Sequence, residues 1–149
     1  MKYLLDTCTF VYLLDKTLKE NITTILSNAD NDIYITNESV KEFVHLVQGE
    51  RIGYSKYVKE TRFDVYDLIE NKLSINVIYT NKQHVKQMMR LPMVEKHNDP
   101  IDRIIISIAI YEGMCLISSD TQFDKYIDFG LDLIQFKRPA EYKSKYKRG

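Results

Sequence analysis

The stretch of the sequence that most constrains the fold covers residues 97–120 and reads HNDPIDRIIISIAIYEGMCLISSD. Pro100 fixes its own φ and disfavours helical angles at the residue before it, so a turn is expected here, directly before a helix. The helix is rich in isoleucine and is expected to end near Gly113. The apolar run at residues 114–117 is short and bounded by polar residues, which is typical of a buried parallel strand. A helix followed by a buried strand is therefore predicted.

This helix-and-strand unit places one acid in the first turn of its helix and another directly after its strand. Asp102 falls in the first turn of the helix, where the positive end of the helix dipole favours a carboxylate. Asp120 follows the strand, and ligands of open α/β sheets bind at the carboxyl ends of the strands. The rest of the chain is expected either to build the sheet beneath this unit or to add further acids to it.

Short β-rich runs alternate with helical patterns along the whole chain. Strands are predicted at residues 2–5, 33–35, 75–79, 114–117 and 131–136. Further helical patterns lie at residues 10–14, 21–28, 36–47, 56–73 and 81–91, with a short helical turn at 123–126. Thr7 is a candidate N-cap of the first helix, and Ser39, three residues before Glu42, fits a capping box as well as it fits a role in a site. Alternating strands and helices predict an α/β fold, with a parallel sheet covered on both faces.

Composition and length favour a single globular domain. The chain has 149 residues, of which 44% are hydrophobic and 28% charged, as is ordinary for a globular protein. No apolar run is long enough to cross a bilayer, and the N-terminus has no signal-peptide pattern. A cytoplasmic protein without membrane association is therefore expected. Cys8 and Cys115 both lie in apolar contexts, which fits reduced thiols better than a disulfide.

The charge of the chain is balanced overall but unevenly distributed. The formal net charge is zero, so no global basic field indicates a nucleic-acid partner. Six basic residues and the single acid Glu141 lie between residues 137 and 149. We therefore predict a domain at residues 1–136 and a basic C-terminal tail at residues 137–149.

Four carboxylates stand at the ends of predicted elements: Asp6, Glu42, Asp102 and Asp120. The carboxyl ends of parallel strands lie on one edge of a sheet, and the early residues of the helices that follow lie near that edge. Clustered carboxylates repel one another, and a hard divalent cation relieves the repulsion. Mg²⁺ and Mn²⁺ prefer oxygen ligands and can activate water for phosphodiester cleavage. The acids therefore favour a metal site.

Each of these residues also has an ordinary structural interpretation. Asp6 and Asp120 could form turns or cap helices. Asp102 could be present only because a negative charge is favourable near the positive end of the helix dipole. Their common placement within one α/β pattern is what favours a site. For His97 we favour a turn-stabilising hydrogen bond over a proton shuttle. For Arg103 we favour a structural ion pair with an acid over a contact with phosphate.

Several segments of the chain also resemble a known family. These are YLLDTCTFVYLL, ITNESVKEF, the Leu91-Pro92 pair, HNDPIDRIIISIA and LISSDTQFDKY. In their order and spacing the chain resembles PIN-domain proteins, specifically the VapC-like toxin group of toxin–antitoxin systems. The resemblance covers nearly the whole chain, and its most specific part is His-x-Asp-Pro-x-Asp-Arg followed by a strand and Ser-x-Asp.

The resemblance implies a fold, a chemistry and partners. The fold is a parallel three-layer α/β/α sandwich, and the activity is that of a metal-dependent ribonuclease using Mg²⁺ or Mn²⁺. The acidic quartet of the family corresponds to Asp6, Glu42, Asp102 and Asp120, with accessory roles for Asp99, Ser118 and Arg103. The implied partners are an RNA substrate, a small antitoxin protein and a second copy of the chain in a homodimer.

Cys8 departs from this family, which commonly has Asn or His two positions after the first Asp. Two other function classes remain open at this stage. One is a non-catalytic PIN-fold module that acts by binding RNA or protein. The other is a phosphotransfer or phosphatase fold with an Asp after the first strand. This last class is weaker, because such enzymes need a second acid where the chain has Cys8 or paired acids near the N-terminus.

Overall fold

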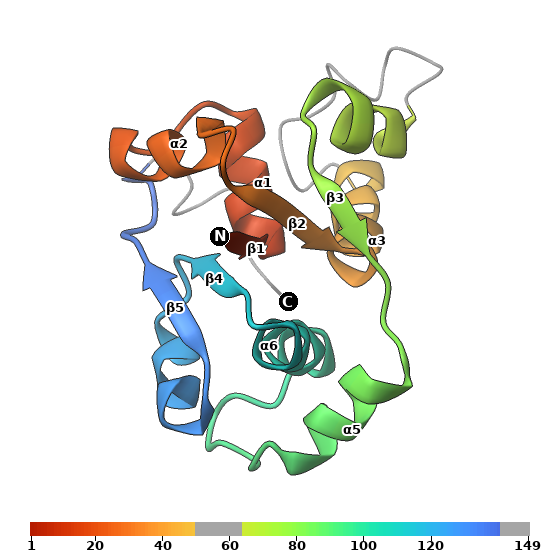
Figure 1. The fold of residues 1–149 in the computed structure, drawn as a ribbon, viewed down its shortest axis with the longest axis vertical. Helices are drawn as coiled ribbons and strands as arrows, with labels where there is room; N and C mark the ends of the chain where they lie inside the picture. Colours follow the sequence, from red (N-terminus) through yellow and green to blue (C-terminus); the bar gives the residue numbers. More distant parts are fainter. Residues whose placement is uncertain (50–63, 141–149) are drawn as a thin grey trace.

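The computed structural model describes residues 1–49 and 64–140. Its centre is a five-stranded sheet in the order β3-β2-β1-β4-β5, and all neighbouring strands are parallel (Figure 1). The strands are β1 (Lys2–Leu5), β2 (Asp32–Thr36), β3 (Asn76–Ile78), β4 (Cys115–Ser118) and β5 (Asp132–Gln135). Every predicted strand is present, and its ends differ from the prediction by a residue at most. The predicted parallel sheet is therefore confirmed.

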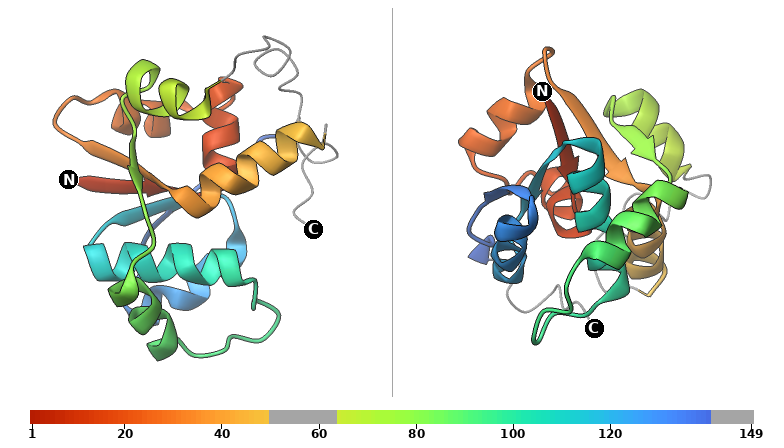
Figure 2. Two further views of the ribbon diagram at one scale, coloured as in Figure 1. Left: turned by 90° about the vertical axis from the view of Figure 1, so that its right-hand side faces the viewer. Right: turned by 60° about the horizontal axis from the view of Figure 1, so that its bottom comes forward.

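Helices cover both faces of this sheet (Figure 2). One face carries α1 (Thr7–Leu14), α2 (Glu20–Ser27), α3 (Asn37–Gln48) and the π-helix η1 (Asp67–Lys72). The other face carries α5 (Lys82–Arg90), α6 (Pro100–Glu112) and the 3₁₀ helix η2 (Thr121–Phe129). The expected three-layer α/β/α sandwich is confirmed. The predicted helix at residues 56–73 lies partly outside the described residues, and its described part contains η1.

Alternation along the strands explains why the core has two halves. In β1 the side chains of Tyr3 and Leu5 join the cluster beneath α1 and α3, whereas Leu4 joins the cluster beneath α6. The same alternation occurs in β4, where Leu116 faces α6 and Ile117 faces α1. Successive side chains of a strand point to opposite faces, so a strand buried on both faces is apolar throughout.

Two candidate helix caps in the sequence are not the ones that the structure uses. The N-cap of α1 is Asp6 rather than Thr7, and the N-cap of α3 is Thr36 rather than Ser39. An N-cap residue needs extended backbone angles, and Thr36 has them with φ −77° and ψ 149°. Its hydroxyl accepts the N–H of Ser39 at 3.0 Å. In both cases the helix begins directly at the strand end, with no intervening turn.

The turn before α6 agrees with the prediction. Asp99 is the N-cap, and its carboxylate accepts the N–H groups of Ile101 at 2.8 Å and Asp102 at 3.4 Å. Pro100 occupies the first helical turn, where its missing N–H costs nothing. The helix ends at Gly113, whose φ of +67° lies in the left-handed region that glycine adopts without strain.

His84 fixes the start of α5 and joins this helix to α6. Its Nδ1 accepts the backbone N–H of Asn81 at 3.0 Å, while Asn81 in turn caps the helix through its side chain. Because Nδ1 is an acceptor, the proton of the neutral ring lies on Nε2, which donates to Glu112 at 2.8 Å. The ring is completely buried, so its tautomer is set by these two bonds.

The stability of the folded protein should fall as pH rises above about 9. Burial, with a contribution from the nearby carboxylate of Asp132, raises the pKa of the Cys115 thiol from 9.0 to about 11. Between pH 9 and pH 11 the unfolded chain releases the thiol proton while the folded chain keeps it. The free energy of unfolding should therefore fall by about 1.4 kcal/mol for each pH unit in this range. Urea unfolding at a pH below 9 and at a pH above 11 measures this change. The free energy of unfolding should fall less between the two for Cys115→Ala than for the wild type. Equal losses would contradict this origin.

No helix among the described residues is both long enough and apolar enough to span a bilayer. Cys8 and Cys115 are both buried and form no disulfide, as predicted. The strands thus form one continuous sheet, and a functional site would lie at one end of these strands.

Candidate metal centre

The strand order places a topological switch point between β1 and β4. From β1 the chain proceeds to β2 and β3 on one side, and β4 and β5 then fill the other side. Leu5 of β1 lies opposite Ile117 of β4, so the residues that follow them meet at the carboxyl edge. Ligands of open α/β sheets bind in this position. Asp6 and Ser118 are the two residues that the chain places there.

Asp6 is completely buried and is held by hydrogen bonds from two segments. Its Oδ1 accepts the backbone N–H of Thr9 at 2.9 Å and lies 2.7 Å from the Thr9 hydroxyl oxygen. Its Oδ2 accepts the hydroxyl of Ser118. These donors hold the carboxylate between the end of β4 and the start of α1. The N-cap role and a site role are therefore compatible at this residue.

Ser118 connects the two acids that flank the switch point. Its hydroxyl oxygen accepts the backbone N–H of Asp120 at 3.0 Å while its proton goes to Asp6. Asp120 is half-buried and caps η2 by accepting the N–H of Gln122 at 2.9 Å. The carboxylate of Asp120 is thus oriented by β4 on one side and η2 on the other.

Asp102, Asp120 and His97 form a compact group of potential metal ligands. One ligand atom from each lies within 4.8 Å of the others. Asp102 comes from the first turn of α6, and His97 comes from the loop before that helix. The Nε2 atom of His97 lies 3.2 Å from Oδ2 of Asp102. His97 and Asp102 are buried and Asp120 is half-buried, so this group opens toward solvent on the side of Asp120.

The other predicted site residues take different positions. Glu42 lies half-buried in the second turn of α3, and neither Glu42 nor Asp6 belongs to the group within 4.8 Å as the structure describes it. Asp99 serves as the N-cap of α6. The structure thus brings Asp102 and Asp120 together directly and connects Asp6 to the backbone of Asp120 through Ser118.

Arg103 takes a different role from the predicted ion pair with an acid. Its guanidinium donates to the carbonyl oxygens of Pro92 at 2.8 Å, Leu91 at 3.3 Å and Met88 at 3.5 Å. Carbonyl groups at the end of a helix have no partner within the helix, and a cation is favoured there. Arg103 therefore holds the end of α5 and the start of the following loop against α6.

His97 is the member of the group to which the sequence assigned only a turn-stabilising hydrogen bond. Its ring nitrogens lie beside the hydroxyl of Tyr126 and the carboxylate of Asp102, at 2.7 Å and 3.2 Å. The signal in the sequence was its position five residues before Asp102, across a proline turn that folds the chain back. Burial raises the pKa of the Tyr126 phenol, with the adjacent Arg103 opposing the rise, so the hydroxyl keeps its proton.

The donor set fits a divalent cation. Two carboxylates supply oxygen ligands and the imidazole supplies nitrogen, a combination suited to Mn²⁺ and, through the oxygens, to Mg²⁺. The hydroxyl oxygen of Thr7, next to Asp6 in the chain, is buried and has no hydrogen-bond partner among residues 1–49 and 64–140. Buried polar atoms are normally satisfied, so this hydroxyl favours a bound water or ion nearby.

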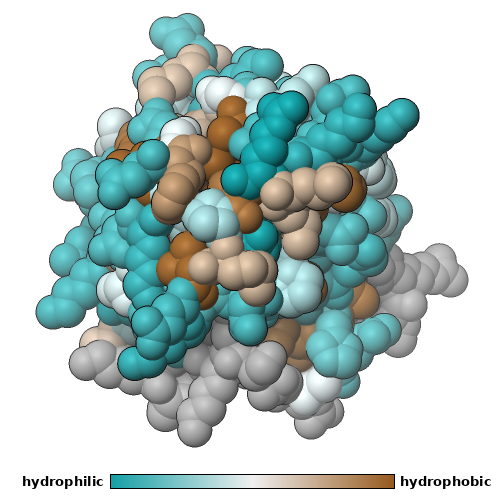
Figure 3. All heavy atoms as spheres, turned by 90° about the horizontal axis from the view of Figure 1, so that it is seen from below, coloured by the Kyte–Doolittle hydropathy of each residue, from teal (hydrophilic) through white to brown (hydrophobic). Residues whose placement is uncertain are grey.

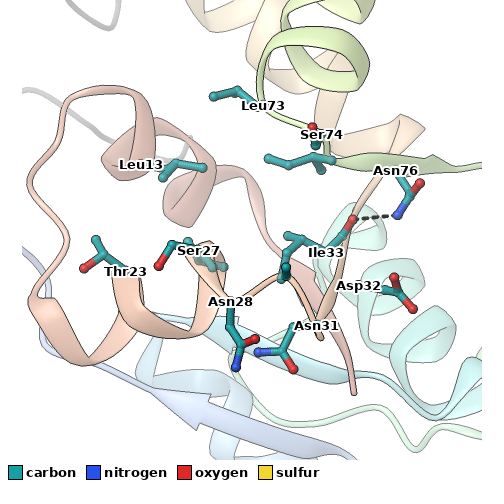
Figure 4. A pocket seen from close by; sticks show the side chains of 13 residues that line it. Leu13, Thr23, Ser27, Asn28, Asn31, Asp32, Ile33, Leu73, Ser74 and Asn76 are labelled. Carbon is teal, nitrogen blue, oxygen red and sulfur yellow. Dashed lines mark hydrogen bonds between the residues drawn. The ribbon is translucent and has the colours of Figure 1, made fainter.

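A cleft on the opposite edge of the sheet is separate from this centre (Figure 4). Its volume is about 740 Å³, and it is lined by the end of α2, the start of β2 and the segment leading into β3. Apolar side chains such as Leu26 and Ile33 lie beside amides such as Asn76, whose side chain donates to the carbonyl of Ile33 at 3.2 Å. Because these residues lie at the amino ends of the strands, the cleft contains none of the clustered acids.

Replacing Ser118 by Ala should weaken metal binding by about 10- to 100-fold, since Asp6 and the Asp120 backbone would both lose their shared partner. Ser118→Thr keeps the hydroxyl and should retain most of the affinity. Calorimetric titration with Mn²⁺ measures the effect. An unchanged affinity in the folded Ser118→Ala variant would show that this hydroxyl does not organise the centre.

Comparison with known proteins identifies the family of the chain. The family model of the PIN domain matches residues 3–128. No curated protein matches the sequence. Among solved structures, VapBC2 from Rickettsia felis bound to a DNA fragment from its promoter is 19% identical, with a TM-score of 0.67 over 92% of this chain and 100% of that chain.

Two other solved structures share the fold. VapBC-1 from nontypeable Haemophilus influenzae is 20% identical, with a TM-score of 0.63 over 91% of this chain and 98% of that chain. DNA-bound VapBC from Salmonella typhimurium is 16% identical, with a TM-score of 0.64 over the same shares. These structures agree in fold, and the family model spans most of the sequence. The chain therefore belongs to the PIN-domain family, and the three similar structures described above are of VapBC proteins.

Proposed function

We propose that the protein is a metal-dependent endoribonuclease, the VapC-like toxin of a type II toxin–antitoxin pair. The observation that carries the proposal is the grouping of Asp102 and Asp120 within 4.8 Å at the carboxyl edge of a PIN domain, with Asp6 connected through Ser118. Nucleases of this family generally depend on divalent metals, and this edge offers the ligands that such ions prefer.

The chemistry follows from the placement of these side chains. Asp6, Glu42, Asp102 and Asp120 would hold Mg²⁺ or Mn²⁺ directly or through water. A bound ion would acidify and orient an attacking water and neutralise charge on the phosphodiester. Ser118 keeps the carboxylate of Asp6 and the backbone of Asp120 in register. Burial of Asp6 and Asp102 strengthens their interaction with a cation, since the interior screens charge less than water does.

RNA binding would depend on positive charge outside this centre. We assign residues 1–136 to the nuclease domain and the basic residues of 137–149 to contacts with the RNA backbone. Lysine and arginine that neutralise phosphates release counterions, so binding should weaken steeply with salt. A cytoplasmic location is part of this proposal, because cellular RNA is the substrate.

The proposed protein partners are a second copy of the chain and a small antitoxin. Figure 3 views the molecule from the side of α5, and hydrophobic residues gather there amid hydrophilic ones. Val85 and Met89 lie one turn apart on α5, and Met93 follows the helix; their exposed fractions are 47%, 80% and 71%. Exposed apolar surface of this kind marks interaction sites. We assign it to protein contacts of the toxin.

The test is expression of the wild type and of Asp6→Asn without any antitoxin, scored by growth and by cleavage of total RNA. Discrete RNA fragments and growth arrest, both lost in Asp6→Asn, are expected. Asp32→Asn is the matched control, since Asp32 is exposed at the first residue of β2 and thus lies at the end of the strands opposite to Asp6. Arrest that persists in Asp6→Asn without RNA fragments would favour the alternative function, a non-catalytic PIN module acting by binding.

A further inference from the structure

The proposed metal centre contains one residue that is not an acid. One ring nitrogen of His97 lies within 4.8 Å of a carboxylate oxygen from each of Asp102 and Asp120, and the Nε2 atom lies 3.2 Å from Oδ2 of Asp102. Only 6% of the residue is exposed, so the ring faces the centre and not bulk solvent. A buried nitrogen in this position can either orient Asp102 or bind the cation itself.

The hydrogen bonds of Tyr126 favour the second of these two roles. Its hydroxyl donates to the backbone carbonyl oxygen of His97 at 3.2 Å and lies 2.7 Å from Nδ1 of the same residue. A phenol has a single proton, so a hydroxyl that donates to the carbonyl can only accept from Nδ1. With this arrangement the proton of the neutral ring lies on Nδ1, and the lone pair of Nε2 faces Oδ2 of Asp102 at 3.2 Å. Two acceptors this close repel each other unless a cation binds between them, whereas a proton on Nε2 would make His97 a donor that only orients Asp102.

The position of the ring is fixed by its surroundings. The ring of His97 makes edge-on contacts with Phe123 and Tyr126, with centroid distances of 5.4 Å and 5.3 Å. Its backbone N–H donates to the carbonyl of Val94 at 3.1 Å. Histidines that bind metals are typically held in this way, with the far ring nitrogen donating to an oxygen that sets the tautomer.

His84 provides the contrast within the same chain. It is equally buried, but its Nδ1 accepts a backbone N–H and its Nε2 donates to Glu112. Both ring nitrogens are therefore engaged in hydrogen bonds that leave no lone pair for a metal. His45, the remaining histidine, is exposed on α3.

We infer that His97 is itself a ligand of the metal ion, binding through Nε2 beside Asp102 and Asp120, and that the centre therefore prefers Mn²⁺ over Mg²⁺. This inference rests on the proposed metal-dependent function. Imidazole is a good ligand for transition metals, whereas Mg²⁺ strongly favours oxygen. An all-carboxylate centre would lack this basis for preferring Mn²⁺.

The test uses the full-length protein loaded with Mn²⁺ and examined by pulsed electron paramagnetic resonance. Direct coordination by His97 should give modulation from a bound ¹⁴N nucleus, and this should change to the ¹⁵N pattern when only histidine is labelled with ¹⁵N. His97→Gln should abolish the nitrogen signal and weaken Mn²⁺ binding by about 10- to 100-fold, with a smaller factor for Mg²⁺. His84→Gln is the matched control and should keep the signal, since Gln also suits a capping box.

The outcomes separate the inference from the proposed function. Mn²⁺ that binds without any histidine nitrogen coupling would overturn the role of His97 as a ligand and leave the nuclease proposal standing. Wild-type protein that binds neither Mn²⁺ nor Mg²⁺ would overturn both. If His97→Gln fails to fold, the ¹⁵N-labelled wild type still decides, because the isotope changes nothing in the structure.

Discussion

Asp120→Asn is expected to reduce RNA cleavage by on the order of 100-fold while leaving the protein folded. Asn is nearly isosteric with Asp and is an equally good N-cap, so it can still accept the N–H of Gln122 and start η2. The negative charge at the metal centre is lost, and with it part of the affinity for the cation. Single-turnover cleavage of a labelled RNA at saturating Mn²⁺ measures the effect on chemistry.

The same substitution should not lower stability in the absence of metal. Like charges held close together raise the free energy of the folded state, so neutralising one of them relieves repulsion with Asp102. Urea unfolding in EDTA should therefore give a free energy of unfolding equal to or above that of the wild type. Asp124→Asn, an exposed acid on the same helix η2, is the control and should change neither quantity. Full cleavage by folded Asp120→Asn would remove this residue from the proposed centre.

Arg103→Met is expected to lower the free energy of unfolding by on the order of 3 kcal/mol. The guanidinium is the shared donor to the carbonyls of Met88, Leu91 and Pro92, and the residue is only 6% exposed. Methionine can fill part of the volume, but it donates no hydrogen bond. Buried carbonyl groups that lose a charged donor cost free energy, and native domains have only about 5 to 15 kcal/mol in total.

Urea unfolding measures this loss, and Arg90→Met is the matched control because Arg90 is exposed at the end of the same helix α5. Arg103→Lys should lie between the two, since an ammonium cannot span several carbonyls as a planar guanidinium does. The loop that Arg103 anchors leads to His97, so metal affinity should fall along with stability. A change of less than about 1 kcal/mol in Arg103→Met would show that water replaces the guanidinium at these carbonyls.

The positions of the strands and of the α6 turn could be predicted because they depend on local chemistry. A short apolar run bounded by polar residues has few alternatives to a buried strand, and Pro100 disfavours helical angles at Asp99 wherever the segment lies. The first-turn position of Asp102 follows from the same turn. These features are decided within a few residues, so a sequence alone contains them.

The caps and the partners of charged side chains could not be predicted in this way. Thr7 and Asp6 are both good N-cap residues, and the choice depends on where β1 ends against its neighbours. The nearest acids in sequence suggested an ion pair for Arg103, whereas the folded chain brings it to the end of α5. Competing local partners of similar energy are separated only by the packing around them.

The sequence by itself determined the fold class, the strands, and the acids available at strand ends and helix starts. Tertiary structure alone decided that β4 lies beside β1, which joins Ser118 to Asp6 across 112 positions of the chain. It also decided that the loop before α6 turns His97 back onto Asp102 and Tyr126. Strand order and loop path depend on burying both faces of one sheet, a property of the whole chain that no local pattern contains.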